Sequence, residues 1–295
     1  MRLAILDSVS DPARPEAEND DRVGWNDSAA FVIDGATGLG DPVMAPPASD
    51  AAWLAEQARR FLEEHLTPAR DIGDVVRDLC AAARDAFFRA AGAPEIERYR
   101  FPNAAFQALR LTARGIETAG LADCTLILRD GAGRILRHSG SRAGRGNEQK
   151  AARRAIERGG GFDAAGEGFR NRDTLEDLRA KRSRLNSDPD GAWTLGVVPE
   201  AGAYVRRALL EIDLPAIGVL CTDGFAGLVD NYQACSDGDL VARAEADGLM
   251  ALLHELRQIE RVVDPDGTRF PHYKRCDDAS AVLVRSLAGR PKTLT

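Results

Sequence analysis

The chain has 295 residues, of which 44% are hydrophobic and 29% charged, and its formal net charge is −7. This composition suffices for a sizeable core. The acidic balance argues against nucleic acid as a partner, because proteins that neutralise phosphates usually present an excess of Lys and Arg. No apolar run approaches the roughly 18 to 20 residues of a membrane span, and residues 1–12 lack the apolar core of a signal peptide. We therefore expect a cytoplasmic protein that works without nucleic acid or a membrane.

The first 91 residues predict two strands and then two amphipathic helices. Both helices carry apolar residues at helical spacing, and Ser49 is a suitable N-cap for the first of them. The strands are expected over residues 3–6 and 29–33, and the helices over residues 49–66 and 71–91.

The middle of the chain is predicted to be rich in strands and then strongly basic. Strands are expected over residues 106–112, 120–128 and 134–138, with a hairpin turn before the last. From Arg134 to Arg184 the sequence holds 14 Lys and Arg against 7 Asp and Glu, and residues 148–158 predict a basic helix that ends at three glycines. We expect a basic variable insertion or flap at about residues 139–185. Two interpretations stay open, a solvated surface and a docking patch beside the active site.

The C-terminal third predicts three strands and one long helix. The strands are expected over residues 193–198, 217–221 and 281–286, and the helix over residues 239–259. Strands and helix pairs are grouped rather than strictly alternating, which predicts an α+β fold instead of a doubly wound parallel sheet. The glycines of residues 35–40 have the spacing Gly-x-x-Gly-x-Gly and are followed by Pro42, a pattern that disfavours a dinucleotide site.

Aspartates at the ends of predicted strands are the main functional signal. They occur in the stretches Asn19-Asp20-Asp21, Ile33-Asp34-Gly35, Thr222-Asp223-Gly224 and Cys276-Asp277-Asp278. A single aspartate after a strand is usually a turn residue. Four such stretches together predict a carboxylate-lined site, and carboxylate oxygens are ligands that Mg²⁺ and Mn²⁺ prefer.

With Leu121-Ala122-Asp123-Cys124, these stretches resemble the metal-dependent protein phosphatases of type 2C in order and approximate spacing. In that family they read Asn-Glu-Asp, Asp-Gly-x-Gly-Gly, Gly-Asp-Ser, Ser-Asp-Gly and Asp-Asn-x-Thr. The resemblance runs from Asn19 to about Ser286 and is to bacterial-type members. It implies one phosphatase-like domain over residues 1–295, built as a four-layer αββα sandwich. It also implies hydrolysis of phosphoserine and phosphothreonine monoesters in proteins by a water that two Mn²⁺ or Mg²⁺ ions activate.

The resemblance further implies which residues form the catalytic centre. Asp34 would bridge both ions, and the carbonyl of Gly35 would help to hold one of them. Asp223 and Asp277 would complete the shell of the other ion. No protein nucleophile is needed in this scheme.

Three more carboxylates would lie around that centre. Asp20 and Asp21 would act largely through metal-bound waters, although Asp20 stands where the family usually has the longer Glu. Asp123 lies where some members of the family bind a third, weaker ion.

One group that the family uses is missing from its usual place. The phosphate-binding Arg of the family lies four residues before the acid at position 20, and this chain has Glu16 there. Arg14, Arg22 or a residue of the basic segment would then bind the substrate phosphate. Ala36 replaces a His of many eukaryotic members. The missing Arg and the substitution at Asp20 keep open the alternative of a catalytically silent protein that binds and regulates a phosphoprotein. A third possibility is an enzyme of the same fold that hydrolyses small phosphate esters.

Overall fold

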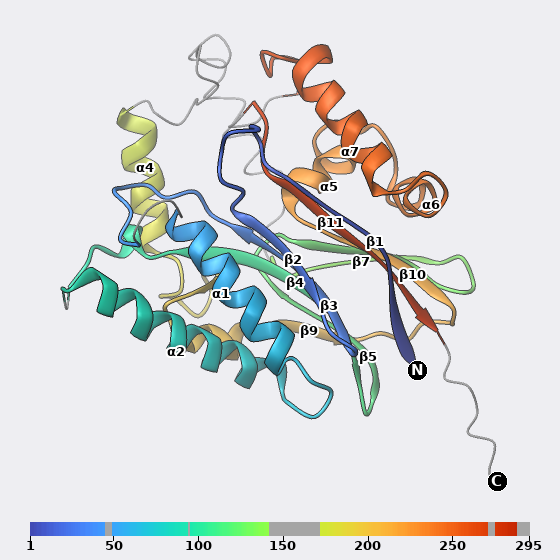
Figure 1. Ribbon diagram of the computed structural model, residues 1–295, viewed down its shortest axis with the longest axis horizontal. Coiled ribbons are helices and arrows are strands. Elements are labelled where there is room, and N and C mark those ends of the chain that lie inside the picture. Colours follow the sequence, from blue (N-terminus) through green and yellow to red (C-terminus); the bar gives the residue numbers. More distant parts are fainter. Residues whose placement is uncertain (45–48, 94, 142–171, 271–274, 288–295) are drawn as a thin grey trace.

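The computed structural model describes residues 1–44, 49–93, 95–141, 172–270 and 275–287. Within these ranges the chain forms two antiparallel sheets packed face to face, with helices on both outer faces (Figure 1). The predicted α+β class and the four-layer αββα arrangement are confirmed. No helix in the described ranges has both the length and the apolar character needed to cross a membrane.

The first sheet has the strand order β1-β11-β10-β6-β7. These strands are β1 (Arg2–Asp11), β11 (Ala279–Leu287), β10 (Ala216–Cys221), β6 (Thr125–Arg129) and β7 (Ile135–Ser139). Three helices and a π-helical turn follow β10 along the chain, namely α5 (Asp223–Asp230), α6 (Asp237–Asp247), α7 (Leu249–Gln258) and η4 (Ile259–Val263). The apolar sides of α5, α6 and α7 pack on the outer face of this sheet.

The second sheet has the strand order β2-β3-β4-β5-β9, and the short β8 pairs with β4. These strands are β2 (Asp21–Trp25), β3 (Ala29–Gly35), β4 (Asn103–Thr112), β5 (Gly115–Leu121), β9 (Arg206–Leu209) and β8 (Leu195–Gly196). Its outer face is covered by α1 (Asp50–His65) and α2 (Ile72–Ala91). The short helix η1 (Arg98–Arg100) contacts α4 (Arg172–Ser183), and η3 (Pro199–Tyr204) contacts α2.

Strand β3 separates two cores because successive side chains of a strand point to opposite faces. Phe31 and Ile33 pack under α1 and α2, whereas Ala30 and Val32 pack between the two sheets. The same alternation places Asp34, the next even-numbered residue, on the face between the sheets. The strand therefore aims this carboxylate into one end of the sandwich.

Both N-terminal helices begin where the sequence predicts. The Ser49 hydroxyl accepts a hydrogen bond from the backbone N–H of Ala52 at 2.9 Å, and the Asp71 carboxylate accepts one from Gly73 at 2.8 Å. These caps satisfy backbone donors that a first helical turn leaves without partners.

Three predicted elements are wrong in detail. The strand expected over residues 120–128 is divided between β5 and β6, because Ala122 takes a positive φ of 59° and the chain passes there from one sheet to the other. The helix expected over residues 239–259 is interrupted at Gly248, whose φ is 83°. The first strand runs to Asp11 instead of ending at Leu6. The sequence patterns also missed β2, β9, α4 and α5.

The predicted basic segment is described only at its two ends. Residues 139–141 follow β7, and residues 172–185 contain α4. The helix predicted over residues 148–158 and the three glycines after it lie outside the described residues.

Candidate functional site

Asp21 and Asp34 face each other across β2 and β3. Residues directly opposite each other in antiparallel strands project to the same face of the sheet. The Asp21 side chain is 1% exposed and Asp34 is partly buried. The hairpin thus places two carboxylates together at the end of the layer between the sheets.

The first sheet brings two more carboxylates to the same place. Asp223 begins α5 immediately after β10, and Asp277 lies just before β11, which is the neighbour of β10. Asp123 lies in the connection where the chain crosses from β5 to β6. Strand ends and connections from both sheets therefore contribute to one cluster.

The charges of these residues act on Asp34. Burial raises the pKa of the Asp34 carboxyl well above its usual range, and the neighbouring charges of Asp223, Asp21, Asp123 and Asp277 raise it further. Of the five other predicted side-chain ligands, all except Asp20 thus contribute to one electrostatic cluster. Carboxylates crowded in this way favour a bound proton or a bound cation.

Asp21 is also a buried carboxylate with a raised pKa, and a hydrogen bond holds its side chain. Burial raises its pKa well above the usual range, and Asp278, Asp277 and Asp223 raise it further. A hydrogen bond from Thr222 acts in the opposite direction, because the hydroxyl donates to Asp21 Oδ2 at 2.8 Å. Thr222 thereby fixes the orientation of the Asp21 carboxylate.

Asp278 organises the backbone of the neighbouring loop. Its two carboxylate oxygens accept hydrogen bonds from the backbone N–H groups of Ala13 and Asp20, at 2.8 and 2.7 Å. Asp20 Oδ1 in turn accepts a hydrogen bond from the Ser49 hydroxyl at 2.5 Å. Asp20 is therefore connected to the N-terminus of α1, and its contact with an ion through water stays a prediction.

Two glycines permit close approaches of the backbone within the cluster. A Cβ atom on Gly35 would lie 2.6 Å from the carbonyl oxygen of Asp20, and a Cβ atom on Gly224 would overlap the carbonyl of Asp278. Larger residues at these positions would push apart the loops that carry Asp20 and Asp277. The role of the Gly35 carbonyl as a metal ligand stays a prediction.

The donors of the cluster fit hard divalent ions. Within the described residues, no group of three or more His, Cys, Asp and Glu side chains is placed so that it could by itself hold a metal ion. Mg²⁺ usually keeps several waters and needs only one or two protein carboxylates, so an open arrangement of this kind suits it. All the side-chain donors are carboxylates, and a cation would relieve the repulsion that raises the pKa values of Asp21 and Asp34.

Comparisons with solved structures show which proteins share this architecture. A PPM Ser-Thr phosphatase, MsPP from Mycobacterium smegmatis, is 12% identical in sequence, with 97% of this chain and 98% of that chain covered at a TM-score of 0.53. The serine/threonine phosphatase PstP from Mycobacterium tuberculosis is 15% identical, with 98% and 100% covered at a TM-score of 0.53. The catalytic domain of PstP in complex with two manganese ions is also 15% identical, with 97% and 99% covered at a TM-score of 0.53. The chain has the PPM phosphatase fold.

The resemblance inferred from the aspartate stretches is thus confirmed at the level of the fold. No protein-family model and no curated protein matches the sequence. The fold is recognisable in the structure because it depends on the layers and strand order, which persist at 12 to 15% identity.

The two arginines predicted to bind substrate lie in different surroundings of this PPM fold. Arg22 donates to the carbonyl oxygens of Asn19 and Asp21 at 2.6 and 2.7 Å and to the Glu56 carboxylate at 3.1 Å. A substrate phosphate would have to compete with these contacts. Arg14 is exposed in the turn that follows β1, and its contact with substrate stays a prediction.

Sequence analysis missed Arg257, which connects two segments of the site. This α7 residue is 7% exposed, and its guanidinium donates to Asp11 Oδ2 at 2.8 Å, to Glu260 Oε2 at 2.7 Å and to the carbonyl oxygen of Asp277 at 2.9 Å. It therefore ties the end of β1 to the segment that carries Asp277. The available signal was its position four residues after Leu253, on the buried side of a predicted helix.

Replacing Arg257 with lysine should loosen the site. Lysine keeps the charge beside Glu260 but lacks the planar fork that reaches Asp11 and the Asp277 carbonyl together. We expect a loss of about 2 to 3 kcal/mol in the free energy of unfolding and a fall of roughly tenfold in kcat, measured by urea melts and steady-state kinetics. The matched control is Arg243→Lys, on the partly exposed pair with Glu255, where little change is expected. Equal effects in the two variants would refute a positioning role.

Proposed function

We propose that the chain hydrolyses phosphoserine and phosphothreonine monoesters in proteins with two bound Mn²⁺ or Mg²⁺ ions. The observation that carries this proposal is the electrostatic convergence of four aspartates on Asp34 at one end of the sandwich. The shared fold supports it, because the catalytic domain of PstP, which has this fold, was solved with two manganese ions. A cytoplasmic location and a phosphoprotein substrate belong to the same proposal.

The proposed ligand set is the one that the resemblance to type 2C phosphatases implies. Asp34 would help to hold both ions, the Gly35 carbonyl would help to hold one of them, and Asp223 and Asp277 would help to hold the other. Asp123 would hold a third, weaker ion. When bound, the ions would supply a water nucleophile of lowered pKa and would neutralise charge on the phosphoryl oxygens.

The remaining residues of the site would keep these ligands in place. Thr222 orients the Asp21 carboxylate, and Asp278 fixes the backbone of Asp20. Arg257 holds the carbonyl of Asp277. Catalytic sites depend on geometry held to within about 0.5 Å by such supporting contacts.

The proposed activity predicts metal-dependent release of phosphate. The purified protein should release phosphate from a phosphoserine peptide and from an aryl phosphate in Mn²⁺, should lose this activity in excess EDTA, and should regain it when Mn²⁺ exceeds the chelator. Malachite green measurements of free phosphate would detect each step. Full turnover in excess EDTA would contradict the metal mechanism. Hydrolysis of the aryl phosphate without any of the peptide would indicate an enzyme for small phosphate esters.

A second function is favoured by the missing phosphate-binding Arg. Glu16 occupies its expected position and the guanidinium of Arg22 already binds Glu56, so a silent member that binds and regulates a phosphoprotein is the alternative. Such a protein would bind the phosphoserine peptide in Mn²⁺ without releasing phosphate. Turnover of the peptide rules this alternative out.

A further inference from the structure

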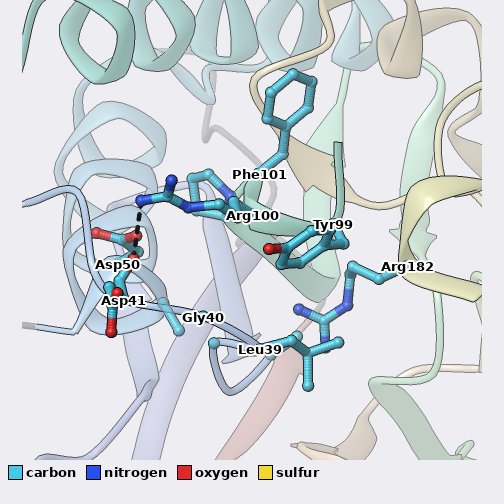
Figure 2. Close-up of a pocket in the computed structure, with 12 residues that line it drawn as sticks. Leu39, Gly40, Asp41, Asp50, Tyr99, Arg100, Phe101 and Arg182 are labelled. Carbon is cyan, nitrogen blue, oxygen red and sulfur yellow. Dashed lines mark hydrogen bonds between the residues drawn. The ribbon is translucent and has the colours of Figure 1, made fainter. Parts of the chain in front are cut away.

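A small pocket that opens to solvent, with an enclosed volume of about 20 Å³, lies beside the end of β3 (Figure 2). It is lined by residues of the loop that follows Gly35, by the first turn of α1, by residues 99–102 and by Arg182 of α4. Ala36, two residues after Asp34, belongs to this lining, whereas Asp34 and the four aspartates that act on it do not. The pocket therefore adjoins the carboxylate cluster without being part of it.

Two arginines line this pocket and bind the loop after β3. Arg182 donates to the carbonyl oxygen of Thr37 at 3.3 Å, and Arg100 donates to the carbonyl oxygen of Asp41 at 3.2 Å. Carbonyl groups are neutral, so these hydrogen bonds do not themselves compensate the positive charge of either guanidinium group. Figure 2 shows the two side chains approaching the pocket from different sides, Arg100 near Asp41 and Asp50, and Arg182 near Leu39.

Arg182 has no anionic partner in the described part of the chain. It donates a hydrogen bond to the Thr37 carbonyl, and no described carboxylate forms a salt bridge with it. Burial lowers the pKa of the Arg182 guanidinium, which is the effect of removing a charge from water without pairing it. A partly desolvated guanidinium in this state gains more from an anion than a fully hydrated one does.

Two aspartates, Asp41 and Asp50, also line the pocket on the side of Arg100. Asp50 accepts hydrogen bonds from the backbone N–H groups of Val43 and Met44 at distances of 2.7 to 3.0 Å. Arg100 Nη1 forms a long ion pair with Oε2 of the exposed Glu97 at 3.8 Å, and the buried Nε of Arg100 has no hydrogen-bond partner. The pocket thus offers donors from two arginines toward an incoming anion.

We propose that the pocket lined by Arg100 and Arg182 binds a second phosphoryl group of the substrate, next to the one that is hydrolysed. This inference rests on the proposed function and specifies its substrate class as multiply phosphorylated segments. Guanidinium groups suit phosphoryl oxygens because they offer several donors in a plane. Because the pocket is separate from the carboxylate cluster, it suits a second phosphoryl group of the substrate and not the one that is hydrolysed.

Arg182→Gln tests this proposal with little disturbance of the loop. The glutamine amide still has a donor for the Thr37 carbonyl, but the positive charge is lost. The probes are peptides with one phosphoserine and with two phosphoserines separated by one to four residues. Their Kd values are measured by fluorescence anisotropy in Mg²⁺, and kcat/KM is measured for the same peptides and for an aryl phosphate.

The wild type should bind at least one doubly phosphorylated peptide about tenfold more tightly than the singly phosphorylated one. Arg182→Gln should lose this advantage, and should keep its Kd for the singly phosphorylated peptide and its kcat/KM for the aryl phosphate within about twofold. Arg182→Lys should retain part of the advantage, because it keeps the charge. If thermal melts show that Arg182→Gln is unfolded, Arg100→Gln carries the same test.

Arg179→Gln is the matched control. This residue lies on the same helix, donates to the carbonyl of Leu39 at 2.9 Å and stacks on the Tyr99 ring at 4.8 Å, but it does not line the pocket. It should therefore keep the preference for two phosphoryl groups.

Equal Kd values of the wild type for singly and doubly phosphorylated peptides would overturn the proposal. So would equal loss of the preference in Arg179→Gln and Arg182→Gln, which would indicate a general effect of charge. Because binding is measured separately from turnover, a protein that discriminates between the peptides but hydrolyses neither would contradict the proposed function and leave the second phosphoryl site standing.

Discussion

Replacing Asp34 with asparagine should lower kcat/KM by roughly three orders of magnitude or more while the fold survives. Asparagine has the same size, but its amide offers a single neutral oxygen in place of two charged ones. It cannot be shared between two cations as a carboxylate can. Steady-state hydrolysis of an aryl phosphate in Mn²⁺ measures the loss, and circular dichroism checks the fold.

Although Asp34→Asn should lower activity, it should not lower the stability of the metal-free protein. The charge of Asp34 is disfavoured by burial and by Asp223 and Asp21, so a neutral side chain removes repulsion. In EDTA, Asp34→Asn should melt at the same temperature as the wild type or higher. The control is Asp27→Asn, an exposed aspartate beyond the other end of β2, which should change neither activity nor stability. Near-normal turnover of Asp34→Asn would mean that Asp34 is only a turn residue.

The position of Asp34 at the end of a strand was the most predictable part of the site. An apolar run from Ala29 to Ile33 indicates a strand, and a strand determines the direction of the residue that ends it. The antiparallel pairing of β2 with β3 brings Asp21 opposite Asp34. In contrast, Asp223 and Asp277 meet them only because two sheets pack face to face, which no local pattern encodes. Their assignment depended on the resemblance to type 2C phosphatases.

Elements that depend on single backbone conformations were not predictable in the same way. Residues 120–128 are almost continuously apolar, and only the positive φ of Ala122 divides them between two sheets. Gly248 interrupts a helix in the structure, although an isolated glycine within a helical pattern is often tolerated. Arg182 and Arg257 acquire their roles through contacts with residues distant in sequence. The fold class was therefore easier to predict than the groups that support and surround the site.

Removing divalent ions should destabilise the protein, and more so at higher pH. At a free ion concentration about 100 times its Kd, one bound ion adds about 2.7 kcal/mol to the free energy of unfolding. For a chain of this size that energy corresponds to a Tm increase of roughly 5 to 10 °C. Differential scanning fluorimetry in Mg²⁺ and in EDTA, at pH 5.5 and at pH 8, measures the difference.

The sign of the pH effect follows from the raised pKa values of Asp21 and Asp34. In the metal-free protein the folded state binds more protons than the unfolded state between the unfolded pKa, about 3.9, and the raised folded pKa. The free energy of unfolding therefore falls as pH rises through this window. A cation replaces those protons, so the Tm increase caused by Mg²⁺ should be larger at pH 8 than at pH 5.5, and Asp34→Asn should show little increase at either pH. An equal Mg²⁺ effect in the wild type and in Asp34→Asn would place the ions away from this cluster.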